Sequence, residues 1–90
     1  MRQSITIRIL EVPPQNYIGS IGGYVEDREV DDVYDKDIVL GMVIDSFKKA
    51  NNLNTPTVLF GVTDKQENIF YRGTIQRNGK KISLSGTSIQ

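Results

Sequence analysis

Two strand-like runs on either side of Asn78-Gly79 constrain the fold of this chain more than any other feature. Asn-Gly is the strongest short signal for a two-residue hairpin turn, and residues 70–77 and 80–87 both alternate between apolar and polar side chains. We therefore predict an antiparallel hairpin whose apolar members share one face. Its predicted cross-strand pairs are Arg77 with Lys80, Ile75 with Ile82, Gly73 with Leu84, and Tyr71 with Gly86.

Three further segments are predicted to be strands. Residues 4–12 alternate between apolar and polar side chains, as a half-buried strand does. Residues 57–63 form a nearly continuous apolar run, which predicts a central strand covered on both faces. A short strand is expected near residues 22–27, after a glycine-rich loop, and the acidic residues that follow are expected to run over the surface as a loop.

Residues 36–50 are predicted to form a helix, because their apolar side chains recur at spacings of three and four. Asp35 or Asp37 can cap the first turn, where negative charge also suits the helix dipole. Asn51 or Asn52 is expected to end the helix in the left-handed conformation.

These segments indicate one α+β domain over residues 1–90. One helix packed on an antiparallel sheet of four to five strands, in the order β(β)αβββ, would bury the apolar side of each element. The side chains that we expect in the core are Ile5, Ile7, Ile9, Leu40 or Val43, Phe47, Phe60, Ile75, Ile82 and Leu84.

The chain contains no cysteine and no histidine, and this excludes most familiar enzyme mechanisms. Disulfides, Cys-ligated metal sites and a Ser-His-Asp triad cannot form without these residues. Serine and lysine are present on the last hairpin, but no spacing singles out a nucleophile and its base. We therefore expect a protein that is not an enzyme and uses no cofactor and no metal.

The location of the protein is expected to be the cytoplasm. No stretch approaches the roughly 18 apolar residues that a transmembrane helix needs. Near the start of the chain, Arg8 interrupts the apolar core that a signal peptide would require.

Charge is distributed unevenly along the chain, although the formal net charge is zero. Residues 26–37, called the acidic segment below, hold seven of the eleven acidic residues and two basic ones. Residues 38–90 hold seven basic residues and three acidic ones. Polarity of this kind bears on partners and on steering rather than on the fold.

The acidic segment has three interpretations. It can be a solvated loop that leads into a capped helix, or a calcium loop, although the spacing of an EF-hand is missing. It can also dock on a basic protein surface, where it would imitate the phosphates of a nucleic acid. For that last interpretation the expected contact residues are Glu26, Asp27, Glu29, Asp31 and Asp32, with Tyr24 and Tyr34 as flanking anchors.

The function that we expect is therefore a protein-interaction module, either an inhibitor or an adaptor. One alternative is a small-molecule or nucleotide binder that uses the loop from Gly19 to Gly23 and the basic residues of the last hairpin. Another is a self-assembling subunit in which the acidic segment of one copy meets the basic hairpin of the next. Direct nucleic-acid binding through Arg72, Arg77, Lys80 and Lys81 is not expected, because four basic residues are few.

Overall fold

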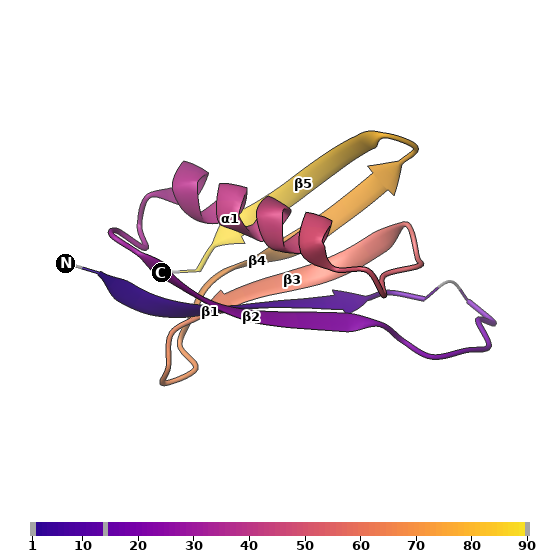
Figure 1. The fold of residues 1–90 in the computed structure, drawn as a ribbon, viewed down its shortest axis with the longest axis horizontal. Coiled ribbons are helices and arrows are strands. Elements are labelled where there is room, and N and C mark those ends of the chain that lie inside the picture. Colours follow the sequence, from indigo (N-terminus) through magenta and orange to yellow (C-terminus); the bar gives the residue numbers. More distant parts are fainter. Residues whose placement is uncertain (1, 14, 90) are drawn as a thin grey trace.

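The structure is a computed structural model that describes residues 2–13 and 15–89. Its elements in chain order are β1 (Gln3–Glu11), β2 (Gly23–Val30), α1 (Lys36–Lys49), β3 (Thr57–Thr63), β4 (Ile69–Asn78) and β5 (Lys81–Ser88). The strands form one antiparallel sheet in the order β2-β1-β3-β4-β5, and α1 packs on one face of it (Figure 1). The predicted α+β fold with β(β)αβββ order is confirmed.

Strand β2 is longer than predicted and includes the first part of the acidic segment. It pairs with β1 along its whole length, from Leu10 opposite Gly23 to Gln3 opposite Val30. The predicted strand near residues 22–27 is present, and the prediction that the acidic residues after it form a surface loop is wrong for residues 28–30. A strand at the edge of a sheet tolerates charged side chains, because one of its sides is open to water.

The last hairpin is present, but its predicted register is wrong by two residues. The observed pairs are Asn78 with Lys81, Arg77 with Ile82, Ile75 with Leu84, Gly73 with Gly86, and Tyr71 with Ser88. The loop residues are Gly79 and Lys80, and Gly79 has a φ of 63°. A type II′ turn places glycine at the first loop position, whereas the predicted turn had glycine second. A shift of two leaves the same side chains on each face.

Helix α1 begins where predicted, since Asp35 is the N-cap and its side chain accepts a hydrogen bond from the Ile38 backbone N–H. Lys48 and Lys49 lie in the last turn, where positive charge suits the helix dipole. The predicted left-handed end at Asn51 or Asn52 is wrong, because the chain leaves the helix at Ala50 in an extended conformation.

The core lies between α1 and the sheet. Of the expected core residues, Ile5, Ile7, Ile9, Val43, Phe47, Phe60 and Ile75 are buried, while Leu40, Ile82 and Leu84 are partly buried and pack against the others. A register shift between Val62 and Thr63 accompanies the burial of two consecutive aromatic residues, Phe70 and Tyr71. A β-bulge explains this pattern, because it interrupts the strict alternation of side chains.

The opposite face of the sheet, called the open face below, has no helix packed on it in the described part of the chain. The prediction that residues 57–63 are covered on both faces is therefore wrong. Strand β3 lies at the centre of the sheet, and Val58, Phe60 and Val62 are buried, but Leu59 is 46% exposed. Within residues 2–13 and 15–89, no helix is long and apolar enough to cross a membrane.

Candidate functional site

The acidic segment is divided by the alternation of β2. Tyr24, Glu26 and Arg28 are partly buried and point toward the helix side of the sheet, whereas Asp27 and Glu29 are exposed on the other side. After Val30 the chain turns toward α1, and Asp31, Asp32 and Asp35 lie in this connection. The predicted contact residues therefore belong to three different environments.

Glu26 has an internal role. Its carboxylate accepts hydrogen bonds from the Ser46 hydroxyl at 2.7 Å, from Lys49 Nζ at 3.1 Å and from Arg28 at 3.3 Å. The hydrogen bond from Ser46, followed by those from the two cations, lowers the pKa of Glu26 from 4.5 to about 2. The side chain is only 18% exposed. Glu26 thus ties the edge strand β2 to α1 and is not a free charge.

Asp27 lies on the open face and also has partners within the chain. One carboxylate oxygen accepts from the Thr6 hydroxyl at 2.8 Å, and the other lies 3.1 Å from Lys65 Nζ. These hydrogen bonds lower the pKa of Asp27, with Thr6 as the larger cause. The positive charge of Lys65 compensates the negative charge of Asp27. Asp27 is therefore considered apart from the remaining acids.

The remaining acids gather at one end of the molecule, where β2 leads into α1; we call this region the acidic end. A pocket of about 260 Å³ lies there. Its lining consists of four acidic residues, one basic residue and three apolar ones, namely Glu29, Asp31, Asp32, Asp35, Arg2, Val30, Ile38 and Met42. The lining therefore combines carboxylates with apolar side chains and has three more negative charges than positive ones.

Arg2 shows how a cation sits in this pocket. Its guanidinium lies 3.6 Å from Asp31 and 4.0 Å from Glu29, and all three side chains are more than half exposed. Exposed pairs of this kind contribute little stability, typically about 0–1 kcal/mol. Asp32 and Asp35 are used locally, because they accept hydrogen bonds from the backbone N–H groups of Tyr34 and Ile38.

The two tyrosines expected as anchors differ. The Tyr24 ring is partly buried and its hydroxyl donates to Glu26 at 3.2 Å, so it supports the internal cluster. Tyr34 is 64% exposed beside the acidic end, with the edge of its ring against Phe70 at a centroid distance of 5.8 Å. Only Tyr34 is therefore placed to meet a partner.

Arg2, Ile38 and Met42 were missed as site residues. By their spacing Ile38 and Met42 belong to the apolar stripe of α1, but Ile38 is 53% exposed. The width of the apolar stripe is the only sequence signal for an uncovered apolar side chain on this helix. The tilt of the helix over the sheet decides which part of the stripe stays uncovered, and the sequence does not give that tilt.

The glycine-rich loop between β1 and β2 has a structural explanation. The Gly22 N–H donates to the Glu11 carboxylate at 2.6 Å, and a Cβ at Gly22 would lie 2.0 Å from the Asn52 carbonyl oxygen. Glu11 also accepts from the Asn54 and Thr55 backbone N–H groups, and these bonds, with Thr55 the largest cause, lower its pKa. The backbone N–H of Gly22, which a phosphate would need as a donor, is therefore already bound to a carboxylate of the chain itself.

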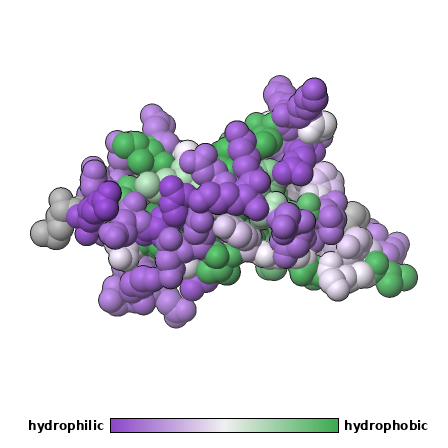
Figure 2. Space-filling model, viewed as in Figure 1, coloured by the Kyte–Doolittle hydropathy of each residue, from purple (hydrophilic) through white to green (hydrophobic). Residues whose placement is uncertain are grey.

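The same loop carries exposed apolar side chains. Ile18 is 97% exposed and Ile21 is 54% exposed. Figure 2 shows a hydrophobic group at the end of the molecule where Figure 1 draws this loop. It is separate from the acidic end, which lies at the other end of β2.

The basic residues of the last hairpin do not form one strip. Arg77 is on the helix side, with its guanidinium carbon 4.6 Å from the centre of the Phe47 ring. Arg72 lies an odd number of residues away on β4 and points to the open face, while Lys80 and Lys81 are at the turn. In the part of the chain that the structure describes, no group of three or more acidic residues is arranged to hold a metal ion.

Comparisons with known proteins add no assignment to this geometry. No protein-family model matches the chain, and neither a search of curated proteins nor one of solved structures returned a match.

Proposed function

We propose that this chain is a non-enzymatic protein-interaction module, an inhibitor or an adaptor of the cytoplasm, that docks its acidic end on a basic protein surface. The observation that carries the proposal is the pocket whose apolar side chains, Ile38 and Met42 among them, lie among four carboxylates. Lysine and arginine combine an aliphatic stem with a charged tip, so a pocket of this composition suits both parts of such a side chain.

The arrangement of charges also supports this proposal. Glu26 and Asp27 are compensated within the chain, but Glu29, Asp31, Asp32 and Asp35 share, among the described residues, one basic neighbour, Arg2. Nothing in the local hydrogen bonding requires Glu29 or Asp31 to be acidic. Clustered carboxylates attract a basic partner over a distance of about one Debye length and raise the association rate. A nucleic-acid-binding surface is a basic surface of the right kind.

The proposal is tested with the double variant Glu29→Gln and Asp31→Asn and a lysine-rich peptide as probe. Binding measured by calorimetry should weaken severalfold, and the dependence of affinity on salt should become shallower, because two exposed charges are lost. The matched control is Asp45→Asn with Glu67→Gln, which removes two exposed acids elsewhere.

Both variants should keep the thermal midpoint of the parent protein, because surface substitutions of this kind usually change stability by less than about 0.5 kcal/mol. Equal affinity of the parent protein and the Glu29/Asp31 variant for the peptide would mean that the acidic end is not the docking surface. Equal weakening by the control would show that only the overall charge matters. Host proteins that the parent chain captures from the extract, and that salt elutes, are then tested for binding to the same two variants.

A further inference from the structure

The loop between β1 and β2, residues 12–22, leaves apolar side chains in water at one end of the molecule. Ile18 is 97% exposed, and Ile21, Tyr17 and Val12 are exposed as well. In Figure 2 hydrophobic atoms project at the end where Figure 1 draws this loop. Apolar side chains that gather in one exposed patch mark a surface that meets a protein or a membrane.

The loop has a defined shape, because it is bonded at its base and at its tip. At the base, the Glu11 N–H donates to the Gly22 carbonyl oxygen at 3.0 Å. At the tip, the Tyr17 hydroxyl donates to the Ser20 carbonyl oxygen at 3.3 Å, and Gly19 has a φ of 154°, which other residues rarely adopt. The loop therefore presents its apolar side chains outward in a fixed turn.

The segments at this end of the molecule can leave water at little electrostatic cost. Residues 12–25 contain no charged residue, and neither do residues 50–56, which connect α1 to β3. The two segments lie against each other, since a Cβ at Gly22 would be 2.0 Å from the Asn52 carbonyl oxygen. Removing an unpaired charge from water is costly, and here no such charge has to be removed.

Positive charge surrounds the loop. The Val12 N–H donates to the Thr57 carbonyl oxygen and the Arg77 N–H to the Pro56 carbonyl oxygen, so β3 begins and β4 ends beside the loop. Figure 1 shows the loop, the end of α1 and the β4–β5 turn together at the right of the molecule, and we call this region the loop end. Its exposed cations are Lys48, Lys49, Arg77, Lys80 and Lys81.

The acidic residues near the loop end do not cancel this charge. Glu11 is 3% exposed and accepts from backbone N–H groups, Glu26 is bonded to Lys49, and Asp45 is an exposed acid of α1. Five positive charges stand against three negative ones when all of these are counted. The three cations around the β4–β5 turn form no ion pair with any described residue.

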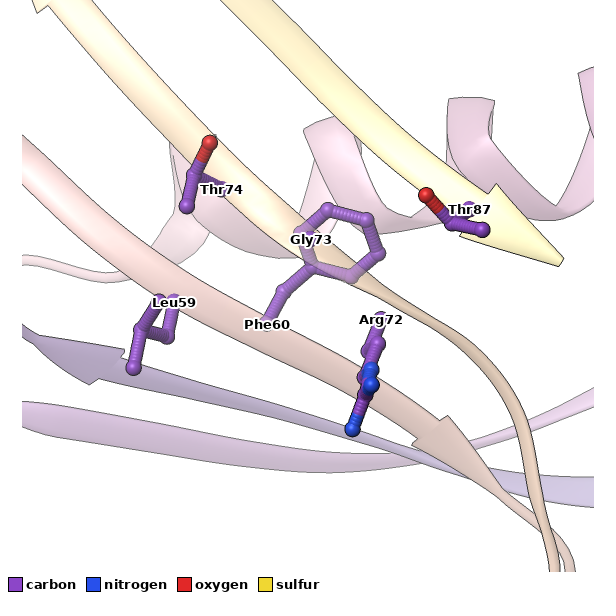
Figure 3. Close-up of a pocket in the computed structure, with 6 residues that line it drawn as sticks. All are labelled: Leu59, Phe60, Arg72, Gly73, Thr74 and Thr87. Atoms are coloured by element: carbon purple, nitrogen blue, oxygen red, sulfur yellow. The ribbon is translucent and has the colours of Figure 1, made fainter. Parts of the chain in front are cut away.

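Apolar exposure continues from the loop onto the adjoining half of the open face. Leu10 and Leu59 are paired across β1 and β3, and both are exposed. Figure 3 shows Leu59 and its partner Thr74 at a hollow of about 340 Å³ on this face. The acids of the face on β2, Asp27 and Glu29, lie farther along that strand, away from the loop. The half nearest the loop is therefore apolar and free of acids in the described strands.

The spread of the cations favours a lipid surface over a protein segment or a nucleic acid. They come from α1, β4 and the β4–β5 turn, so a broad anionic surface meets all of them, whereas one acidic segment does not. Tyrosine suits a membrane boundary, because its ring is apolar and its hydroxyl is polar. The phosphate backbone of a nucleic acid would leave Ile18 in water, since phosphates offer no apolar contact.

The opposite charge of the two ends orients the molecule. Figure 1 draws the acidic end at the left and the loop end at the right of the longest dimension, which measures 44 Å. A negatively charged surface repels the acidic end and attracts the loop end, so the loop arrives first.

We propose that the loop end binds the surface of a membrane that contains anionic lipids. Ile18 and Ile21 enter the boundary between headgroups and acyl chains, where apolar side chains typically reach a depth of about 5–10 Å, and the surrounding cations contact the headgroups. A few apolar side chains or a few cations bind weakly alone, but the two contributions add. The acidic end shares no residue with this site and faces away from the membrane, so the two proposals stand or fall separately.

The experiment mixes the parent protein with vesicles of phosphatidylcholine and phosphatidylserine in about a two-to-one ratio and measures the bound fraction by flotation. The protein should float with these vesicles at low salt and be released as the salt concentration rises. Vesicles of phosphatidylcholine alone should bind much less protein. No flotation with the mixed vesicles, or equal flotation with both kinds, would overturn the proposal.

A fluorescent side chain shows which end enters the lipid. The chain contains no tryptophan, so Ile18→Trp introduces a single reporter at the tip of the loop. Its emission should move to shorter wavelength when mixed vesicles are added, because the indole leaves water. Ile69→Trp, at an exposed isoleucine where β4 begins, is the matched control and should not shift. Equal shifts at the two positions, or none at position 18, would contradict insertion of the loop.

The apolar contribution is measured with Ile18→Ser and Ile21→Ser combined. Both side chains are more than half exposed, so the thermal midpoint should stay unchanged, while binding to mixed vesicles should weaken about tenfold or more. Ile69→Ser is the control at the far end of β4 and should bind as the parent does. Unchanged binding in the double variant would rule out the loop as the inserted group.

The contribution of charge is measured with Lys80→Gln and Lys81→Gln combined. Binding to mixed vesicles should weaken about tenfold or more, because a cation near an anionic surface contributes roughly a fivefold increase in affinity. Lys36→Gln with Arg72→Gln removes two exposed cations outside the loop end and should have little effect. Equal losses in the two double variants would show a general charge effect and would count against a site at the loop end.

Two other occupants are separated with the Ile18→Trp protein. A single-stranded oligonucleotide that shifts its emission at a lower phosphate concentration than the mixed vesicles would replace the membrane by a nucleic acid. A shift on raising the protein concentration, without vesicles, would replace it by a second copy of this chain.

Discussion

On β3, Val58 is fully buried beneath α1, whereas Leu59, the next residue, is 46% exposed on the opposite face. The two faces of this sheet differ in the same way throughout. On the covered face, most side chains are explained by contacts within the chain, down to the charged Glu26 with its four side-chain donors, Ser46, Lys49, Arg28 and Tyr24. On the open face, Leu59, Gly61 and Arg72 have no such explanation.

This difference indicates which residues of the chain to test for a function. A residue that is required by packing carries little information about partners, even when it is charged or aromatic. Apolar side chains that gather in one exposed patch, in contrast, point to something outside the chain. The open face, the acidic end and the exposed Ile18 and Ile21 of the loop between β1 and β2 meet this description, whereas Gly22 in that loop is explained by contacts within the chain.

The largest expected effect lies at the centre of the covered face. Phe47 is 2% exposed, and Arg77 lies against its ring. Phe47→Ala should lower the free energy of unfolding by about 3–5 kcal/mol, measured by urea denaturation, because it leaves a large cavity. Phe47→Leu should cost clearly less, since it fills most of the space. A loss below about 1 kcal/mol for the alanine variant would mean that α1 does not cover this face.

The ion cluster at the edge of the covered face gives a pH dependence. The pKa of Glu26 is lowered from 4.5 to about 2, so its ionised form stabilises the fold. That stabilisation is complete above pH 4.5 and is lost as the pH falls toward about 2. Glu26→Gln should therefore lower the free energy of unfolding by about 1–3 kcal/mol at pH 7. The difference in stability between variant and parent should become smaller as the pH falls from 4.5 toward about 2.

Thermal unfolding at a series of pH values, followed by circular dichroism, measures this gap. Other carboxylates with lowered pKa values, such as those of Glu11 and Asp27, make both proteins less stable in acid, so only the difference between the two curves reports on Glu26. Asp45→Asn, on the exposed side of α1, is the control and should not alter the curve. A gap that stays constant with pH would contradict the ionic role of Glu26.

A smaller effect is expected from one hydroxyl of the core. Tyr71 is 2% exposed, and its hydroxyl donates to the Val33 carbonyl oxygen at 2.7 Å. Tyr71→Phe should lower stability by about 1–2 kcal/mol, because it leaves that carbonyl without its partner. Tyr34→Phe is the matched control at an exposed ring and should be close to neutral. Equal effects of the two substitutions would show that the connection before α1 is not held by Tyr71.

The smallest effect is expected on the open face. Leu59→Thr should change the free energy of unfolding by less than about 0.5 kcal/mol, whereas Val58→Thr next to it should be strongly destabilising. Chemical denaturation of both variants makes the comparison between faces directly. A loss above about 1 kcal/mol for Leu59→Thr, especially one that depends on protein concentration, would show that the open face is covered in solution.

Local chemistry was sufficient for much of this fold. The apolar spacing of residues 36–50, with Asp35 as a cap, predicts the helix, because its first turn is satisfied by neighbours in sequence. The alternation in residues 4–12 and the turn signal at Asn78-Gly79 predict strands for the same reason. Fold class and most of the core follow from these patterns, since both depend on periods that are visible along the chain.

The candidate site was predicted less well, because strand pairing decides to which face of the sheet each of its side chains points. Glu26 and Asp27 are neighbours in the sequence and look equivalent there. Once β2 pairs with β1, successive side chains point to opposite faces, so Glu26 meets Ser46 and Lys49 while Asp27 meets Thr6 and Lys65. The acids that remain exposed could be identified only after these partners were known.

The register of the last hairpin shows the same division between sequence and tertiary structure. The residues around Asn78-Gly79 determined that a tight turn forms, but they are compatible with turns that begin at either residue. The observed register sets Gly73 opposite Gly86, and the Phe60 ring from β3 lies where a Cβ on either glycine would be, at 2.8 and 2.9 Å. A third strand therefore decides the pairing, because only two adjacent glycines leave room for that ring.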